Sequence, residues 1–388
     1  MFDTEVLVIG GGPGGSATAL QLARSGHRVM LLDRAGFPRD KVCGEGLMPY
    51  GVGELERLGL AAPEGSQRFV GIGYTVGGHS AVGRFPGGRY GLGVRRSRLD
   101  AELAARCEEA GVERRHGVQV RGAGGWPGRM WVDTPSGQIR ARVLVGADGM
   151  HSVVRKSLGL QRAARGRPRY GLRGHFRLAA SARALDLVEV HAADGLEFYL
   201  TPTGDRELNV AVLLEKGATR DLKGDVRGGF DRILARHAPL VELLRDAEPV
   251  SEPALCGPLR QEATSVVADG AVLVGDAAGF LDGITGEGMS LTLLSARLAA
   301  EVVSRGLRAN TLGRRALREY ETRRWRASRD LTWLTEIVLA GIRHRRLAGR
   351  VVRGLKRHPE VFERVLAVNA GVGGLADVGL ANLVRVLL

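Results

Sequence analysis

The feature that most constrains the fold is a glycine-rich turn between two apolar runs near the start of the chain. Val6–Ile9 predicts a short strand buried on both faces, and Val29–Leu32 predicts a second strand that ends on Asp33. The turn between them reads Gly10-x-Gly12-x-x-Gly15, and a helical pattern continues from it to Ser25. The sequence therefore predicts a complete β-α-β unit with an acidic residue after its second strand.

Each glycine of this turn has a mechanical role in binding a dinucleotide. Gly10 makes the tight turn, Gly12 lets the backbone approach a pyrophosphate, and Gly15 lets the helix pack closely on the strand. The helix start directs N–H groups and its positive dipole at the phosphates, while Asp33 accepts from ribose hydroxyls. We expect a dinucleotide site that suits a resident FAD at least as well as a transient NAD(P). The candidate contacts are Gly10, Gly12, Pro13, Gly15, Asp33 and Arg34.

Length and composition favour a globular protein of two lobes. With 388 residues, 44% of them hydrophobic and 25% charged, the chain can bury a large core. No apolar run reaches the roughly 18 residues of a spanning helix, and no basic segment typical of a signal peptide begins the sequence. The widely spaced Cys43, Cys107 and Cys256 form neither a disulfide framework nor a zinc pattern. We therefore expect a reduced, cytoplasmic setting and no metal.

The net charge of +14 comes mostly from arginine and is concentrated towards the end of the chain. Residues 314–364 hold fifteen Arg or Lys against six Asp or Glu, a net of +9. Two explanations of this excess are open. One is a bias of composition towards arginine, and the other is a surface that binds an acidic carrier protein or a membrane. No aromatic platform or nucleic-acid motif accompanies the charge, so we expect no nucleic-acid partner.

The loop from Phe37 to Pro49 contains further candidates. Gly44 allows the backbone to approach a flat group, such as a flavin ring. Cys43 is either a redox group beside that ring or a small residue in a tight turn. Further on, Arg96 stands just before a helical pattern, where it suits either a phosphate or a solvated basic turn.

Two later strand ends repeat the pattern of a buried run that stops on an acidic residue beside glycine. Val143–Val145 and Ala271–Val274 are the two runs, and the carboxyl ends of parallel strands meet at one edge of a sheet. A helix then begins near residue 286, where its amides can face negative charge, as at the N1–O2 edge of a reduced flavin. The candidate groups here are Asp148, Gly149, Gly275, Asp276, Gly286, Gly288 and Met289.

Residues 170–254 predict a second domain. Four alternating segments separated by Gly and Asp turns indicate antiparallel strands that roof a pocket, followed by one helix over 229–245. Single strands are also expected over 69–76 and 118–120, and the tail is expected to be helical. The candidates to face the pocket, each with a structural role as the alternative, are Arg173, His175, Phe198 and Tyr199.

Taken together, the three strand ends resemble the FAD-dependent oxidoreductases of the para-hydroxybenzoate hydroxylase fold, over about residues 1–310. The resemblance implies that Arg96 contacts the flavin and that Asp148-Gly149 lies between FAD and a transient NAD(P)H. It also implies that Asp276 holds the ribityl chain and that Gly286–Met289 lies at the pyrimidine edge of the ring.

The implied fold class is α/β plus antiparallel β. A Rossmann-type FAD-binding domain would be formed by residues 1–68, 94–168 and 255–310. A β-sheet substrate domain would be formed by 69–93 and 169–254. Residues 311–388 would make a C-terminal helical region.

Within that fold, Lys41-x-Cys43-Gly44-Glu45-Gly46 and Thr285-Gly286-Glu287-Gly288 are similar to the geranylgeranyl-reductase-like branch, which includes prenyl reductases and monooxygenases of secondary metabolism. The chain departs from the prenyl reductases, because Phe198-Tyr199-Leu200-Thr201-Pro202 stands in place of their Tyr-x-Trp-x-Phe-Pro stretch. Gly44-Glu45 followed by Pro49 also resembles flavin-dependent halogenases, whose Trp-x-Trp-x-Ile-Pro motif is absent.

The resemblance leaves four functions open. The sequence favours an NAD(P)H-using monooxygenase in which FAD and O2 hydroxylate a lipophilic or polyketide-like metabolite. The second is a geranylgeranyl-type C=C reductase, in which Cys43 and Glu45 would be the catalytic, ring-side or proton-handling groups. The third is a non-catalytic flavoprotein, peripheral to a membrane or docked on a carrier protein through the basic tail. The fourth is a halogenase.

Overall fold

The structure is a computed structural model and describes residues 2–193, 195–342 and 345–387. Its first layer is a sheet centred on β1, whose two neighbours both run parallel to it. Leu7 and Val8 in β1 have no exposed surface, as a strand covered on both faces requires. The strands in spatial order are β20 (Val267–Ala268), β21 (Ala271–Leu273), β11 (Gly137–Gly146), β1 (Thr4–Ile9), β2 (Val29–Leu32) and β8 (Glu113–Arg115), with β9 (Gly122–Trp126) and β10 (Arg129–Thr134) added beside β11.

Helices pack on this sheet and hold the glycine turns against it. The first helix begins at Pro13, directly after the turn, and crosses β1 closely. A Cβ on Gly15 would lie 1.8 Å from the carbonyl oxygen of Gly10, so only glycine permits this crossing. The helices are α1 (Pro13–Arg24), α3 (Arg96–Glu109), α4 (Val153–Ser157) and α7 (Gly288–Arg308), together with the 3-10 turn η3 (Gly275–Ala278).

The second layer is a mixed sheet, here called the substrate sheet. Its strands pair antiparallel, except that β14 and β5 are parallel. One face packs on α5 (Val226–Leu234) and α6 (Ala238–Leu243) through a cluster that includes Phe198 and Phe230. The strands in spatial order are β17 (Glu248–Pro249), β13 (Arg169–Arg177), β16 (Glu207–Glu215), β15 (Leu196–Gly204), β14 (Val188–Ala193), β5 (Gly71–Val76) and β6 (His79–Arg84), and β18 (Ala254–Cys256) also pairs with β13.

Smaller elements join the two layers. In a three-stranded sheet, β3 (Gly46–Leu47) and β4 (Gln67–Phe69) both pair with β7 (Gly91–Gly93). This pairing fixes the end of the loop that contains Cys43 and Glu45. The other connecting elements are α2 (Pro49–Arg57), η1 (Pro86–Gly88), β12 (Gln161–Arg162), β19 (Glu262–Ala263) and η2 (Lys216–Leu222).

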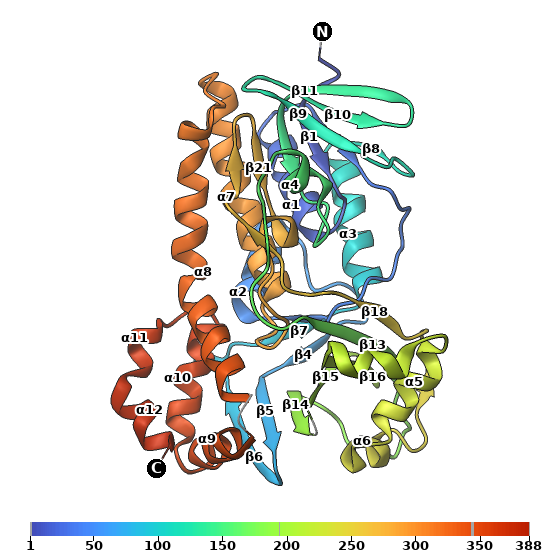
Figure 1. Ribbon diagram of the computed structural model, residues 1–388, viewed down its shortest axis with the longest axis vertical. Coiled ribbons are helices and arrows are strands. Elements are labelled where there is room, and N and C mark those ends of the chain that lie inside the picture. Colours follow the sequence, from blue (N-terminus) through green and yellow to red (C-terminus); the bar gives the residue numbers. More distant parts are fainter. Residues whose placement is uncertain (1, 194, 343–344, 388) are drawn as a thin grey trace.

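The end of the chain is helical. α8 runs beside α7 along one flank of the molecule, and α9 and α10 pack on β6 (Figure 1). The apolar side of α9, with Ala348 and Val352, is buried in one cluster with Phe362 of α10. Within the described ranges we find no helix with the length and apolarity to cross a bilayer. These helices are α8 (Arg314–Ile342), α9 (Arg345–Arg357), α10 (Pro359–Asn369), α11 (Leu375–Val378) and α12 (Leu380–Leu387).

The predicted α/β plus antiparallel β fold is confirmed, but three local predictions are wrong. The helix expected over 229–245 is two helices, α5 and α6, because Pro239 cannot donate its N–H to a continuing helix. The strand expected over 69–76 is divided between β4 and β5, which belong to different sheets. Residues 118–120 form no strand.

Candidate active site

A cavity lies between the first sheet and the substrate sheet, and most of the predicted cofactor residues line it. Its walls come from the turn at 12–14, the loop over 41–48, residues 147–150 and 274–292, and the strands β13, β15 and β16. The predicted residues in the lining are Gly12, Pro13, Cys43, Gly44, Glu45, Arg96, Gly149, Gly275, Asp276, Gly286, Gly288 and Met289. The fold therefore gathers segments from the whole chain around one space.

The corner of the cavity at Gly12 has the chemistry of a pyrophosphate site. α1 begins here without a side-chain cap, so N–H groups of its first turn are left for another partner. The guanidinium groups of Arg39 and Arg96 converge on the same place, since a Cβ on Gly12 would lie 3.7 Å from an Nη2 atom of each. The Nε of Arg39 is buried and has no hydrogen-bond partner. These groups fit the pyrophosphate of FAD.

Asp33 supports this corner from behind. Its carboxylate accepts hydrogen bonds from the backbone N–H of Gly11 at 2.6 Å and from Nη1 of Arg39 at 2.8 Å. Asp33 therefore fixes the glycine turn and orients the guanidinium of Arg39 towards the expected pyrophosphate position. The predicted contact between Asp33 and the ribose stays a prediction. The side chain of Arg34 is exposed and lies outside the cavity lining.

Arg96 is buried at the inner wall and held by a two-pronged ion pair. Its Nε and Nη2 each donate to Asp100 at 2.8 Å, four residues along α3. Burial alone would lower the pKa of Arg96, but the charge of Asp100 outweighs it and raises that pKa. The guanidinium is thus a permanent cation beside the cavity. Its neighbours Arg95 and Arg98 pair instead with Glu207 of the substrate sheet.

Of the predicted pair Asp148-Gly149 at the second strand end, only the glycine lines the cavity. Asp148 accepts from the Oγ of Ser152 at 2.5 Å and from the N–H of Val153 at 2.6 Å, so its carboxylate caps α4. Gly149 lines the cavity with a φ of +80°. Gly10, with a φ of +100°, packs so tightly here that a Cβ would lie 2.3 Å from the carbonyl oxygen of Ala147.

At the third strand end, the loop before α7 divides two cavities. Gly286, Gly288 and Asp276 line the main cavity, while the side chain of Glu287 lies in a smaller cavity beneath α8. Neither carboxyl oxygen of Glu287 has a hydrogen-bond partner, and burial raises the pKa of this group well above its usual value. Burial therefore favours the neutral form of Glu287, and a neutral side chain here leaves the positive end of the α7 amides directed towards the cofactor.

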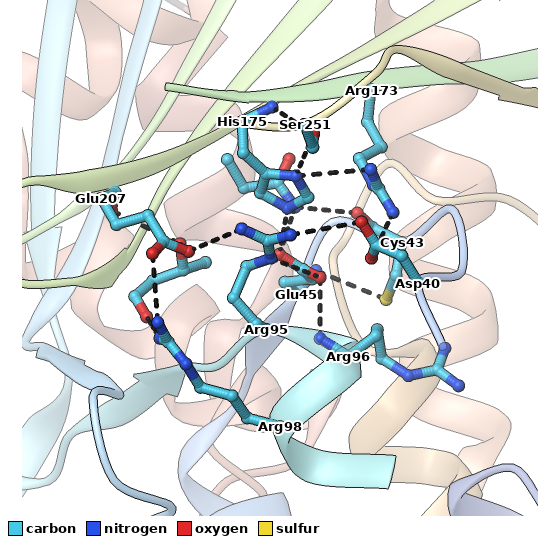
Figure 2. A network of polar contacts seen from close by, with 12 residues as sticks. Asp40, Cys43, Glu45, Arg95, Arg96, Arg98, Arg173, His175, Glu207 and Ser251 are labelled. Atoms are coloured by element: carbon cyan, nitrogen blue, oxygen red, sulfur yellow. Dashed lines mark hydrogen bonds and ion pairs between the residues drawn. The ribbon is translucent and has the colours of Figure 1, made fainter. Parts of the chain in front are cut away.

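Glu45 is the centre of a buried polar network, which Figure 2 shows. The residue adopts the left-handed region, with a φ of +58°, and its side chain is fully buried. One carboxylate oxygen accepts from the N–H of Arg96 at 2.8 Å. The other accepts from Nδ2 of Asn209 at 2.9 Å and from Nε2 of His175 at 2.7 Å. All of these contacts tie the loop over residues 41–48, here called the ring-side loop, to α3 and to the substrate sheet.

The network continues from His175 into the sheet. Because the carboxylate of Glu45 only accepts, Nε2 of His175 carries a hydrogen and Nδ1 is left as an acceptor. Nδ1 lies 2.7 Å from the Oγ of Ser251 and 3.3 Å from Nη1 of Arg173. Arg173 in turn donates to Asp40 at 2.6 Å. Each of these side chains thus has at least one hydrogen-bond partner within the protein (Figure 2).

Two cysteine thiols line the cavity. Burial raises the pKa of the Cys43 thiol, and it raises the pKa of Cys256 to about 11. Both are therefore neutral thiols that hold a proton, and neither is an activated thiolate. The Sγ of Cys43 also accepts from the N–H of Glu45 at 3.4 Å, which fixes it in the loop.

The residues of the substrate sheet that were predicted to face the pocket do not all lie on the cavity face of their strands. Phe198 is wrongly predicted, because successive side chains of β15 alternate and its ring stacks on His237 at 5.1 Å, on the helix side of the sheet. Tyr199 and Arg173 line the cavity, whereas His175 is buried behind the lining in the Glu45 network. The Tyr199 hydroxyl lies 3.1 Å from the carbonyl oxygen of Ile284.

Two residues of the site, Asn209 and Arg39, are not among those predicted from the sequence. Asn209 stands 164 residues after Glu45, in the middle of an alternating strand, and no local signal marks it. Arg39 is different, because a basic residue shortly after the acidic end of β2 could have suggested a second phosphate ligand.

The fold and this cavity define an FAD-dependent flavoprotein. Residues 3–333 match the model of the family described as FAD binding domain, so the chain belongs to that family, and FAD is its cofactor. With a menaquinone reductase of Mycolicibacterium smegmatis the chain shares 29% identity, covering 78% of this chain and 76% of the relative. With a digeranylgeranylglycerophospholipid reductase of Methanoculleus marisnigri it shares 27%, covering 84% and 82%. With a rifampicin monooxygenase of Streptomyces venezuelae it shares 30%, covering 78% and 65%.

Solved structures agree with this fold. A flavoprotein/dehydrogenase of Cytophaga hutchinsonii matches with a TM-score of 0.83 at 21% identity, covering 95% of this chain and 92% of the other. A flavin-dependent brominase matches with a TM-score of 0.83 at 18% identity, covering 98% and 97%. At these identities the likeness concerns the fold. The chain is thus an FAD-dependent oxidoreductase by family.

Proposed function

We propose that the protein reduces a C=C bond of a lipophilic, isoprenoid-like substrate. The observation that supports this most is the chemistry of the cavity wall: it presents a neutral thiol, Cys43, on the ring-side loop, while the nearby carboxylate of Glu45 is occupied by its own network. Reduction of a C=C bond needs a hydride and a proton. A thiol that keeps its proton is suited to supply the second.

The substrate side of the cavity suits an apolar molecule. The wall formed by the substrate sheet and its neighbours consists mainly of apolar side chains, with the Tyr199 hydroxyl engaged at Ile284. Such a wall excludes water and binds an alkyl or isoprenoid chain by burial of apolar surface. The apolar lining residues are Leu172, Val188, Ala211, Leu213 and Leu259.

When bound and reduced, FAD supplies the hydride, and NAD(P)H is the expected source of its electrons. The residues of this chain hold and orient it: Gly12, Arg39 and Arg96 at the pyrophosphate, and the amides after Gly286 at the pyrimidine edge. Cys43 holds a proton at Sγ, on the loop beside the expected position of the flavin ring. The Glu45 network fixes that loop, so Glu45 acts as a positioning residue in this proposal.

The relatives support the same direction. The two reductases named above align over more than three quarters of their own length, whereas the monooxygenase aligns over 65% of its own. Their names refer to a prenylated quinone and to a prenylated lipid.

The test is anaerobic turnover of the purified, FAD-loaded protein with NADPH or NADH and a short-chain menaquinone or a geranylgeranyl lipid. We expect a product with one C=C bond fewer per nicotinamide oxidised. Cys43→Ala should lower this turnover at least tenfold, and Cys256→Ala, in the same cavity, serves as the matched control. FAD reduction by NAD(P)H should be unchanged in Cys43→Ala. Equal turnover in the two variants would remove the proton-donating role from Cys43.

Monooxygenation remains the second candidate, because the rifampicin monooxygenase is 30% identical to this chain. It requires substrate-stimulated O2 uptake and oxygen in the product, with no anaerobic turnover. Halide-dependent product would indicate halogenation, and a flavin that is reduced but never turns over any of these substrates would indicate the non-catalytic role.

A further inference from the structure

The outward side of α8 carries an aromatic and apolar stripe. Trp325, Trp333 and Ile337 are 59%, 63% and 46% exposed. With Arg329 they follow at steps of four residues, which places all four on one side of the helix over roughly 18 Å. The Arg329 guanidinium lies over the Trp325 ring at 5.7 Å. We call these four residues the α8 stripe.

The inward side of α8 faces the cofactor region. The Oγ1 of Thr335 lies 3.0 Å from the Oγ1 of Thr285, in the loop that borders both cavities, and Leu331 lines the smaller cavity. Leu334 is buried in a cluster with residues of the C-terminal helices, among them Val361 and Val378. The stripe is therefore separated from that loop by the thickness of one helix, about 10 Å. Whatever binds the stripe lies close to the loop at the cofactor edge.

The two helices α8 and α9 are basic as a whole. α8 contains seven arginines and four acidic residues, and α9 contains six basic residues and no acidic one. Among the side chains of α9 whose burial is described, residues 347–357, four basic ones face solvent, while its apolar side packs on the substrate sheet. These four are Arg350, Arg353, Lys356 and Arg357.

We propose that the α8 stripe docks the protein on an anionic lipid bilayer. Indole rings prefer the head-group level of a membrane, where an apolar ring and a polar N–H are both accommodated, and arginine side chains pair with lipid phosphates. A second copy of the chain fits less well, because it would bring two positively charged surfaces together. The contact is peripheral, and it concerns a different surface from the proposed reaction.

The test is co-sedimentation of the FAD-loaded protein, without substrate, with vesicles of phosphatidylcholine or of phosphatidylcholine and phosphatidylglycerol. The stripe variant is Trp325→Ala with Trp333→Ala. The matched control is Trp126→Ala, since Trp126 is 60% exposed on the β9–β10 hairpin. FAD content and circular dichroism verify that each variant is folded. A blue shift of tryptophan emission on vesicle addition gives a second readout.

We expect binding to the anionic vesicles to fall at least tenfold in the stripe variant and less than twofold in Trp126→Ala. Replacing Arg350 and Arg353 by Glu should weaken the preference for anionic over neutral vesicles. The proposal is overturned if the wild-type protein ignores both vesicles, or if the stripe variant binds like the wild type. It is equally overturned if light scattering shows a dimer that the stripe variant dissolves. Because no turnover is measured, these outcomes are independent of the proposed reaction.

Discussion

The pyrophosphate corner and the Glu45 network are neighbours in the molecule, but their polar groups differ in their partners. At the corner, a helix begins without a side-chain cap, and the guanidinium groups of Arg39 and Arg96 converge on Gly12. In the network, both oxygens of the fully buried Glu45 are occupied by groups of the protein. Buried polar groups normally have partners, so the first region is arranged for a ligand and the second for rigidity.

This difference indicates that the corner binds the cofactor, whereas the Glu45 network holds the surrounding elements in position. Changes at the corner should affect cofactor affinity and leave the folded protein almost as stable as before. Changes in the network should affect stability first and cofactor binding as a consequence, because the network joins the ring-side loop to both α3 and the substrate sheet.

The largest effect is expected for Glu45→Ala. The substitution leaves the N–H of Arg96, the amide of Asn209 and the ring of His175 without their buried acceptor. We expect the free energy of unfolding to fall by about 3–5 kcal/mol, measured by urea denaturation of the FAD-free protein. FAD retention on purification should fall with it.

Two variants sharpen this result. Glu45→Gln keeps one acceptor oxygen and should lose less stability than Glu45→Ala. Glu56→Ala, at an exposed position of α2, is the control and should change stability by less than about 0.5 kcal/mol. A fully stable Glu45→Ala that had lost only FAD would show that Glu45 belongs with the binding corner.

The opposite pattern is expected for Gly12→Ala. Gly12 has an ordinary φ of −72°, and a Cβ there would meet no protein atom closer than 3.7 Å. The FAD-free protein should therefore keep its thermal midpoint. The methyl group would occupy the place of the pyrophosphate, so we expect the Kd for FAD to rise at least tenfold in a fluorescence-quenching titration. Gly36→Ala, in open space after β2, is the control and should leave the Kd unchanged.

The two regions also differ in how far the sequence reveals them. The turn at Gly10–Gly15 and the strand ends at Asp148 and Asp276 are local patterns, since their geometry depends on residues adjacent in the chain. Asn209 contacts Glu45 across 164 positions, and only the fold brings them together. Strand alternation alone could not assign faces, because β15 is buried along its whole length, and so Phe198 was placed on the wrong side.

Glu287 is a second buried acid of the cofactor region, and unlike Glu45 it has no hydrogen-bond partner for its carboxyl oxygens. Its carboxyl group is buried without a hydrogen-bond partner, in a small cavity also lined by Asp276, Asp282 and Arg324. Burial raises its pKa in the folded protein above the unfolded value. The unfolded state therefore releases this proton at lower pH, and the fold loses stability as the pH rises from about 4.5 towards the folded pKa.

Glu287→Gln removes this titration. We expect the variant to be more stable than the wild-type protein by about 1–3 kcal/mol at pH 8, with the difference shrinking as the pH falls to 5. Urea denaturation of the FAD-free proteins at several pH values measures it. A difference that does not vary with pH would mean that Glu287 is ionised in the folded protein. In that case a group of the cavity stabilises the ionised carboxylate of Glu287, and this part of the cofactor region resembles the hydrogen-bonded network around Glu45.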